Sequence, residues 1–166
     1  MSRGFVKEDD LEHAGTDLLE RPVSSEPNYV TPTGLKQLQD ELQKLDDLRL
    51  QLMQKEDDPF AAQQLAETAR DLRYYAARLE NAELVDTAKQ PQDEIRFGAM
   101  VNVEDEQGQL QEFIIVGEDE ADIAHNKVSW ASPLAKALIG HKVGETVSWK
   151  RPAGNTDLEI TAIRYR

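Results

Sequence analysis

The sequence predicts an α+β protein, in which an N-terminal antiparallel two-helix coiled coil precedes a C-terminal antiparallel sheet with one short helix. Leucines recur at helical spacing in the first half of the chain, and strand-like alternation replaces them after residue 96. An acidic break ending in Pro59 divides the helical half into two arms. We therefore expect a disordered acidic tail at 1–28, a coiled-coil hairpin at 29–86, a linker at 87–96 and a C-terminal domain at 97–166.

The composition excludes several classes of protein. The 166 residues include 32 acidic and 19 basic side chains, which gives a formal net charge of −13, and there is no cysteine. A charge of this sign disfavours binding to free duplex nucleic acid, and the lack of cysteine excludes disulfides and thiol nucleophiles. No apolar run approaches the ~20 residues that span a bilayer, and Met1–Asp10 lacks the apolar core of a secretory signal. We expect a soluble cytoplasmic protein with no membrane partner.

The first arm of the hairpin is expected to begin at Thr31 and Pro32. A threonine can cap the free amides of a helix, and a proline at the first helical position loses no hydrogen bond. A heptad stripe follows, with Arg49 at one seam position; its leucines are Leu35, Leu38, Leu42, Leu45 and Leu52.

The second arm repeats the same starting signal at Asp58 and Pro59. Its leucines stand seven residues apart, at Leu65, Leu72 and Leu79. The break between the arms is short, so the helices Thr33–Lys55 and Phe60–Leu84 should run antiparallel, each extending ~35 Å.

The C-terminal half alternates apolar and polar residues in five short stretches. A helix capped by Ser132 and ending near Gly140 interrupts them, and an acidic loop covers Gly117–Asp122. The expected strands cover 100–105, 112–116, 127–130, 147–150 and 157–165.

Motifs for independent catalysis are missing from the chain. There is no phosphate-binding glycine loop or metalloprotease motif, the three histidines stand apart, and Ser132 is better explained as a helix cap than as a nucleophile. The remaining candidate is the tip of the hairpin, where Glu56, Asp57 and Asp58 are consecutive acids in a tight turn. Two such carboxylates could hold Mg²⁺, although an acidic turn with Asp58 as a cap needs no further function. A tip has no pocket, so any chemistry there must occur inside another macromolecule.

Basic residues occupy the half of the hairpin nearest its tip. Arg49, Lys55, Arg70 and Arg73 could contact RNA phosphates, and they could equally belong to ordinary solvated helix faces.

Several motifs, in a fixed order, resemble those of the bacterial Gre transcript cleavage factors. The segment Tyr29–Leu42 is similar to the start of that family's first helix, and Leu79–Asp86 to the end of its second. The strongest match is a C-terminal block made of Phe97–Val101, Ile115–Asp122, Ser132–Gly140 and Val143–Val147. The resemblance covers roughly Tyr29 to Arg166.

The resemblance implies a transcription elongation factor rather than an enzyme. Its C-terminal domain would be FKBP-like and would dock at the secondary channel of bacterial RNA polymerase, and the coiled coil would promote cleavage of backtracked RNA. Asp57 and Asp58 would then act as ligands of Mg²⁺ supplied by the polymerase, with Glu56 orienting water and no cofactor belonging to the protein itself. The residues implied in docking are Glu118, Asp119, Asp122, Ser132 and Pro133. We expect a monomer that meets nascent RNA only within the polymerase.

The tip departs from the family pattern, which leaves alternatives open. The family's Gly-Asp followed by Glu-Asn-Ala-Glu-Tyr is absent at the break, and Glu80–Glu83 reproduces part of it at the base of the second arm. Each arm also looks about one heptad shorter, which would retract the tip by ~10 Å. One alternative is a secondary-channel regulator of initiation or pausing without cleavage. Another is a prolyl isomerase or chaperone with a helical arm, which an aromatic content of 6% disfavours.

Overall fold

The computed structural model describes residues 18–166, and residues 1–17 of the predicted tail lie outside the described residues. The described chain forms two compact units. One contains the segment up to Ser25 together with Leu38–Asn81, and the other contains Glu26–Gln37 together with Ala82–Arg166. No helix in the described part of the chain is both long enough and apolar enough to span a membrane.

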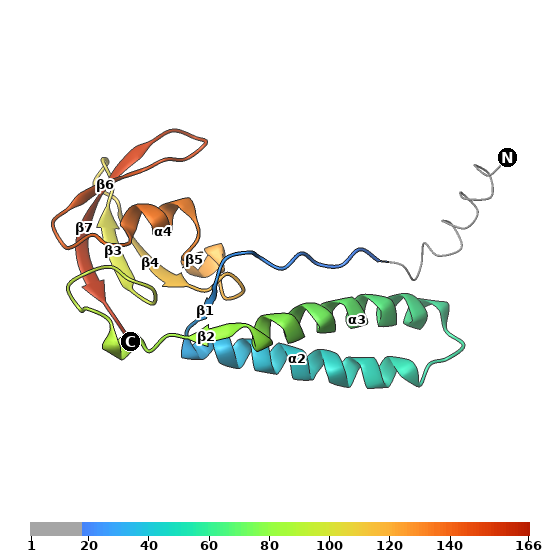
Figure 1. The fold of residues 1–166 in the computed structure, drawn as a ribbon. Helices are drawn as coiled ribbons and strands as arrows, with labels where there is room; N and C mark the ends of the chain where they lie inside the picture. The colour runs from blue at the N-terminus through green and yellow to red at the C-terminus, as the bar shows by residue number, and fades with distance from the viewer. Residues whose placement is uncertain (1–17) are drawn as a thin grey trace. The chain divides into compact units, whose positions relative to one another are not determined.

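The helical unit is built on α2 (Pro32–Met53) and α3 (Pro59–Glu80), two helices of 22 residues each. Figure 1 shows them side by side and antiparallel, joined by one turn. Leu38, Leu45 and Leu52 of α2 are buried at intervals of seven residues, which confirms the heptad stripe. On α3 the buried residues are Ala61, Thr68 and Arg78, and the predicted leucines Leu65, Leu72 and Leu79 are half-buried.

The second arm ends four residues earlier than predicted. Helix α3 stops at Glu80, and Ala82–Leu84 form strand β2, which pairs in parallel with β1 (Asn28–Val30). The sequence gives no sign of this pairing, because each strand has three residues and its partner lies more than fifty positions away. Residues assigned to the end of the tail and to the second helix therefore belong to a two-stranded sheet.

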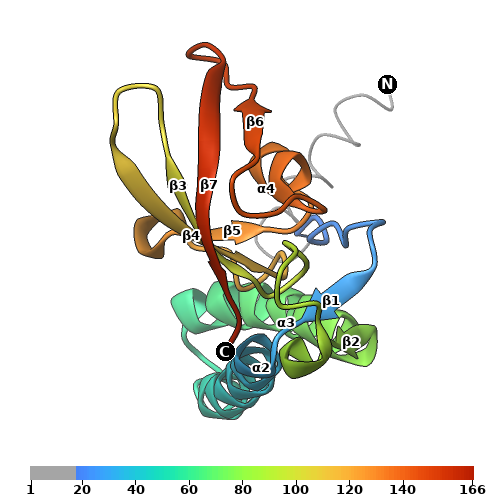
Figure 2. The same cartoon turned by 90° about the vertical axis from the view of Figure 1, so that its left-hand side faces the viewer.

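The C-terminal unit contains a five-stranded sheet in the order β5-β4-β3-β7-β6, together with one short helix (Figure 2). The number of strands and the single helix match the prediction, but β5 pairs with β4 in parallel, whereas the other pairs are antiparallel. The ten residues 117–126 bring the chain back beside Ile114, so that β5 runs in the same direction as β4. The elements are β3 (Met100–Glu104), β4 (Leu110–Val116), β5 (Lys127–Ser129), α4 (Pro133–Leu138), β6 (Thr146–Trp149) and β7 (Thr156–Arg164).

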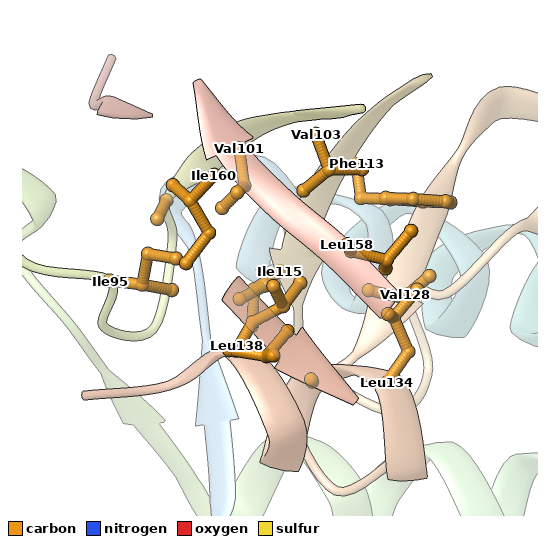
Figure 3. Close-up of a cluster of buried hydrophobic side chains, with 13 residues drawn as sticks. Ile95, Val101, Val103, Phe113, Ile115, Val128, Leu134, Leu138, Leu158 and Ile160 are labelled. Atoms are coloured by element: carbon orange, nitrogen blue, oxygen red, sulfur yellow. The ribbon is translucent and has the colours of Figure 1, made fainter. Parts of the chain in front are cut away.

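The hydrophobic core of this unit lies between the sheet and α4 (Figure 3). Alternate residues of β3 and β7, such as Val101 and Ile160, face Leu138 of α4 and are fully buried. Ile95 is also fully buried, and its backbone amide donates to the carbonyl of His141 at 2.9 Å. The end of the predicted linker at 87–96 thus packs into the domain core.

Candidate functional site

The acidic tip is a tight turn between α2 and α3. The amide of Asp58 donates to the carbonyl of Lys55 at 3.2 Å, which places Glu56 and Asp57 at the two corner positions of the turn. All three carboxylates are exposed, as is the ring of Phe60, which is 85% exposed. Among the described residues, no hydrogen bond or ion pair engages the side chains of Glu56 and Asp57. These two carboxylates are available to a partner.

Asp58 has a structural role as well. Its Oδ1 accepts a hydrogen bond from the amide of Phe60 at 3.0 Å, which makes it the predicted cap of α3. Thr31 and Ser132 cap their helices in the same manner, by accepting from the amides of Gly34 and Ala135. Asp58 thus keeps one carboxylate oxygen for another ligand.

The tip does not form a complete cation site of its own. In the described part of the chain, no three acidic or histidine side chains lie close enough to hold a metal ion. Magnesium requires six ligands in near-octahedral geometry, but it commonly takes only one or two carboxylates from any one protein. The exposed carboxylates of Asp57 and Asp58 are compatible with the second arrangement.

Three of the four basic residues predicted to contact RNA are already paired within the helical unit. Arg49 bonds Asp46 at 3.0 Å, and Arg70 bonds its neighbour Asp71 at 3.1 Å. Arg73 forms an ion pair with Glu20 from the N-terminal segment. Lys55 is exposed at the tip. All three arginines of this set therefore have acidic neighbours, which the sequence alone does not predict.

A groove of about 390 Å³ lies on the C-terminal unit, beside the start of α4. Of the residues predicted to dock, it brings together Asp122, Ser132 and Pro133, whereas Glu118 and Asp119 are not among its lining residues. Apolar side chains form most of the lining, and Lys127, Lys150 and Arg151 add positive charge. The apolar lining residues are Phe113, Ala121, Ile123, Val128, Leu134, Trp149 and Pro152. Such a lining fits an apolar side chain that carries an acidic neighbour.

Asp122 organises the acidic loop at one edge of this groove. Its carboxylate accepts from the amide of Ala124 at 3.2 Å and bonds the Nδ1 atom of His125 at 2.6 Å. The hydrogen bond with His125 is the main cause that holds the pKa of Asp122 below its ordinary value of 3.8.

Replacement of His125 by alanine should raise the pKa of Asp122 toward its ordinary value. The hydrogen bond favours the charged carboxylate, so its removal makes protonation easier. In the wild-type protein the pKa of the carboxyl group lies below 3.8, and in the variant the group takes up its proton at a higher pH. Carbon-detected NMR titration of the Asp122 carboxyl group would measure the shift. Equal titration curves for the two proteins would contradict the assigned contact.

Glu120 is a buried acidic residue whose contacts the sequence does not predict. Unlike its acidic neighbours, it is buried, and its carboxylate accepts from the hydroxyl of Thr31 at 2.5 Å and lies 3.8 Å from the ammonium group of Lys127. It thereby links the acidic loop to the first turn of α2, where a negative charge is favourable. Nothing in the acidic run Glu118–Asp122 marks one carboxylate as buried, so only the structure reveals this contact.

Comparison with known proteins places the chain beside transcription factors. Residues 90–165 match the family model described as transcription elongation factor, GreA/GreB, C-term. Transcription elongation factor GreB of Neisseria meningitidis serogroup B is 35% identical over 153 residues, which cover 83% of this chain and 94% of that protein. Transcription elongation factor GreA of Rhodospirillum rubrum is 36% identical over 160 residues, which cover 82% and 96%.

Two solved structures were also found in the comparison. The GreA factor homolog 1 (Gfh1) of Thermus thermophilus has a TM-score of 0.41 at 25% identity, covering 84% of this chain and 99% of that one. The elongation factor GreA/GreB of Nitrosomonas europaea has a TM-score of 0.42 at 21% identity, covering 83% and 99%.

Proposed function

This chain belongs to the GreA/GreB family of transcription elongation factors, and we propose that it acts at the secondary channel of bacterial RNA polymerase. In this proposal the C-terminal unit binds the polymerase, and the hairpin tip promotes cleavage of backtracked RNA by the polymerase active site. In this proposal the protein is an accessory factor and the catalytic centre belongs to the polymerase, which agrees with its similarity to the Gre transcription elongation factors.

The observation that carries the cleavage role is the exposed corner of the tip. Glu56 and Asp57 project from a turn closed by backbone hydrogen bonds, and Asp58 is fixed beside them as the cap of α3. Asp57 and Asp58 would give carboxylate oxygens to Mg²⁺ held by the polymerase, while Glu56 would orient the attacking water. A divalent cation lowers the pKa of a coordinated water, which is the chemistry that hydrolysis of a phosphodiester needs.

The groove beside α4 supports the docking role. Ile123 is 78% exposed at its edge and adjoins the apolar lining, so it could add to the apolar surface that a partner covers. Asp122, Ser132 and Pro133 line the same groove, and the positive charges of Lys127 and Arg151 complement an acidic group on the partner.

A second candidate, a secondary-channel regulator that does not promote cleavage, is favoured by the double use of Asp58. Its hydrogen bond to the amide of Phe60 occupies one carboxylate oxygen, which leaves fewer ligand atoms for a shared cation. Such a factor would bind the polymerase through the same groove and would leave backtracked RNA intact.

Replacement of Ile123 by aspartate should weaken binding to core RNA polymerase by about tenfold or more, because the proposed complex would bury this side chain and its burial is worth about 1.5–3 kcal/mol. Titration of the labelled full chain with core enzyme would measure the affinity. Leu110→Asp is the matched control, since Leu110 is also exposed, at 73%, but does not line the groove. If Ile123→Asp binds like the wild type, the groove is not the docking site; if the wild type does not bind, the proposed function is wrong.

A further inference from the structure

The N-terminal segment Leu18–Ser25, which we call the strap, contacts helix α3 within the helical unit. Its Glu20 forms a two-pronged contact with the guanidinium group of Arg73. The Nε atom of Arg73 lies 3.0 Å from both carboxylate oxygens, and Nη2 lies 2.5 Å from one of them. One guanidinium group thus contacts both oxygens of the carboxylate, which is a bidentate charged contact.

Arg21, the next residue of the strap, contributes a positive charge to the same contact surface. The guanidinium group of Arg21 lies 4.0 Å from the ring centroid of Tyr74 and 5.2 Å from that of Tyr75, and its Nη1 is 3.3 Å from Asp71. Arg21 therefore stacks on an aromatic face and also pairs with a carboxylate. Glu20 and Arg21 thus place a negative and a positive charge next to Arg73 and Asp71, which carry the opposite charges on α3.

Polar contacts of Glu20 and Arg21 fix the strap on α3, and its apolar residues Leu19 and Val23 are exposed. Leu19 is 91% exposed and Val23 is 45% exposed, and no helix or strand forms between Leu18 and Pro27. The Arg73 and Glu20 side chains themselves stay more than half exposed. Contacts of this kind are screened by salt and are readily exchanged for others.

We propose that the strap covers a binding platform for single-stranded RNA on α3. In this arrangement Glu20 occupies the place of a phosphate on Arg73, and Arg21 occupies the place of a base on the ring of Tyr74. Carboxylate and phosphate bind a guanidinium group through the same fork, and stacking of bases on aromatic rings beside arginines is the usual mode of single-strand recognition. The RNA ligand rests on the proposed function, in which the hairpin meets the transcript.

Local electrostatics fit a strap that is released by competition rather than by mild acid. The pKa of Glu20 lies below its ordinary value of 4.5, first because of the hydrogen bond from Arg73 and then because of the charges of Arg73 and Arg70. A depressed carboxyl pKa keeps the pair ionised above that ordinary value, and the contact is lost only as the pH falls further. At neutral pH a second anion must therefore compete with Glu20 for Arg73.

The attachment of the strap can be measured on the full chain without polymerase. The chain has no cysteine, so Leu19→Cys accepts a single nitroxide label at an exposed position. We expect slow label motion in the otherwise wild-type chain and fast motion after Glu20→Gln combined with Arg21→Gln. Asp47→Asn is the matched control for Glu20→Gln, because it removes the charge of an exposed carboxylate bonded to Gln43 on α2. Equally fast label motion with and without the strap substitutions would show that the strap is not attached to α3, and it would overturn the proposal.

The platform is tested with a labelled single-stranded RNA oligonucleotide. Releasing the strap should tighten binding by about tenfold, whereas Asp47→Asn should change it by less than about twofold. In the variant with Glu20→Gln and Arg21→Gln, the further changes Tyr74→Leu and Arg73→Gln should abolish the gain in RNA affinity. Unchanged RNA affinity after release would overturn the platform, as would a gain in affinity for core polymerase alone. Neither readout requires cleavage or docking, so a failure of the proposed function would be seen separately.

Discussion

Replacement of Asp57 and Asp58 by asparagine is expected to reduce cleavage of backtracked RNA in stalled polymerase complexes by about 100-fold or more. Loss of a single contact made in a transition state commonly costs that much, and here two negative oxygen donors are lost together. Asparagine caps a helix as well as aspartate does, so the contact to the amide of Phe60 and the start of α3 should persist. The length of the labelled transcript after addition of the factor reports the cleavage rate.

A control variant loses the same number of negative charges at positions away from the tip. Asp47 and Glu67 each accept a hydrogen bond from a glutamine four residues earlier, so Asp47→Asn with Glu67→Gln removes two carboxylates from the helix faces. We expect this control to cleave like the wild type. If the tip variant promotes cleavage as well as the wild type does, Asp57 and Asp58 take no part in the mechanism. A wild-type factor that binds polymerase and leaves the RNA intact would instead establish the non-cleaving regulator.

The Gly117→Ala change is expected to destabilise the C-terminal unit by about 3 kcal/mol, near the upper end of overpacking costs. A Cβ atom at Gly117 would lie 2.4 Å from the backbone carbonyl oxygen of Tyr29 in β1, and a backbone atom cannot rotate away. The clash falls where the acidic loop leaves β4, next to the strand that pairs with β2. Urea unfolding followed by tryptophan fluorescence would report it, because Trp130 packs against Tyr29 with ring centroids 5.0 Å apart.

A second glycine separates the clash from backbone strain. Gly144 has a φ of +91°, and a Cβ added there would meet nothing within 4 Å. Gly144→Ala should therefore cost only about 1–2 kcal/mol, the strain of an L residue in the left-handed region. If the two variants unfold at the same urea concentration, the close approach of Gly117 to β1 does not limit stability.

Local patterns in the sequence determined the parts of this protein that depend on near neighbours. The caps at Thr31, Asp58 and Ser132, the buried heptad of α2 and the alternating strands of the C-terminal sheet follow from rules that act within a few residues. The exposed acidic tip also followed, because a short turn between two helices leaves its side chains in solvent.

Only the tertiary structure decided which distant residues meet. The pairing of β1 with β2, the burial of Glu120 against Thr31 and the ion pair of Glu20 with Arg73 join residues more than fifty positions apart. Closing such separations depends on how the whole chain packs, and a three-residue strand or one carboxylate in an acidic run carries no periodic signal of its partner. The sequence therefore placed the acids on the tip and in the loop, whereas packing selected which of them stay free and which hold the fold together.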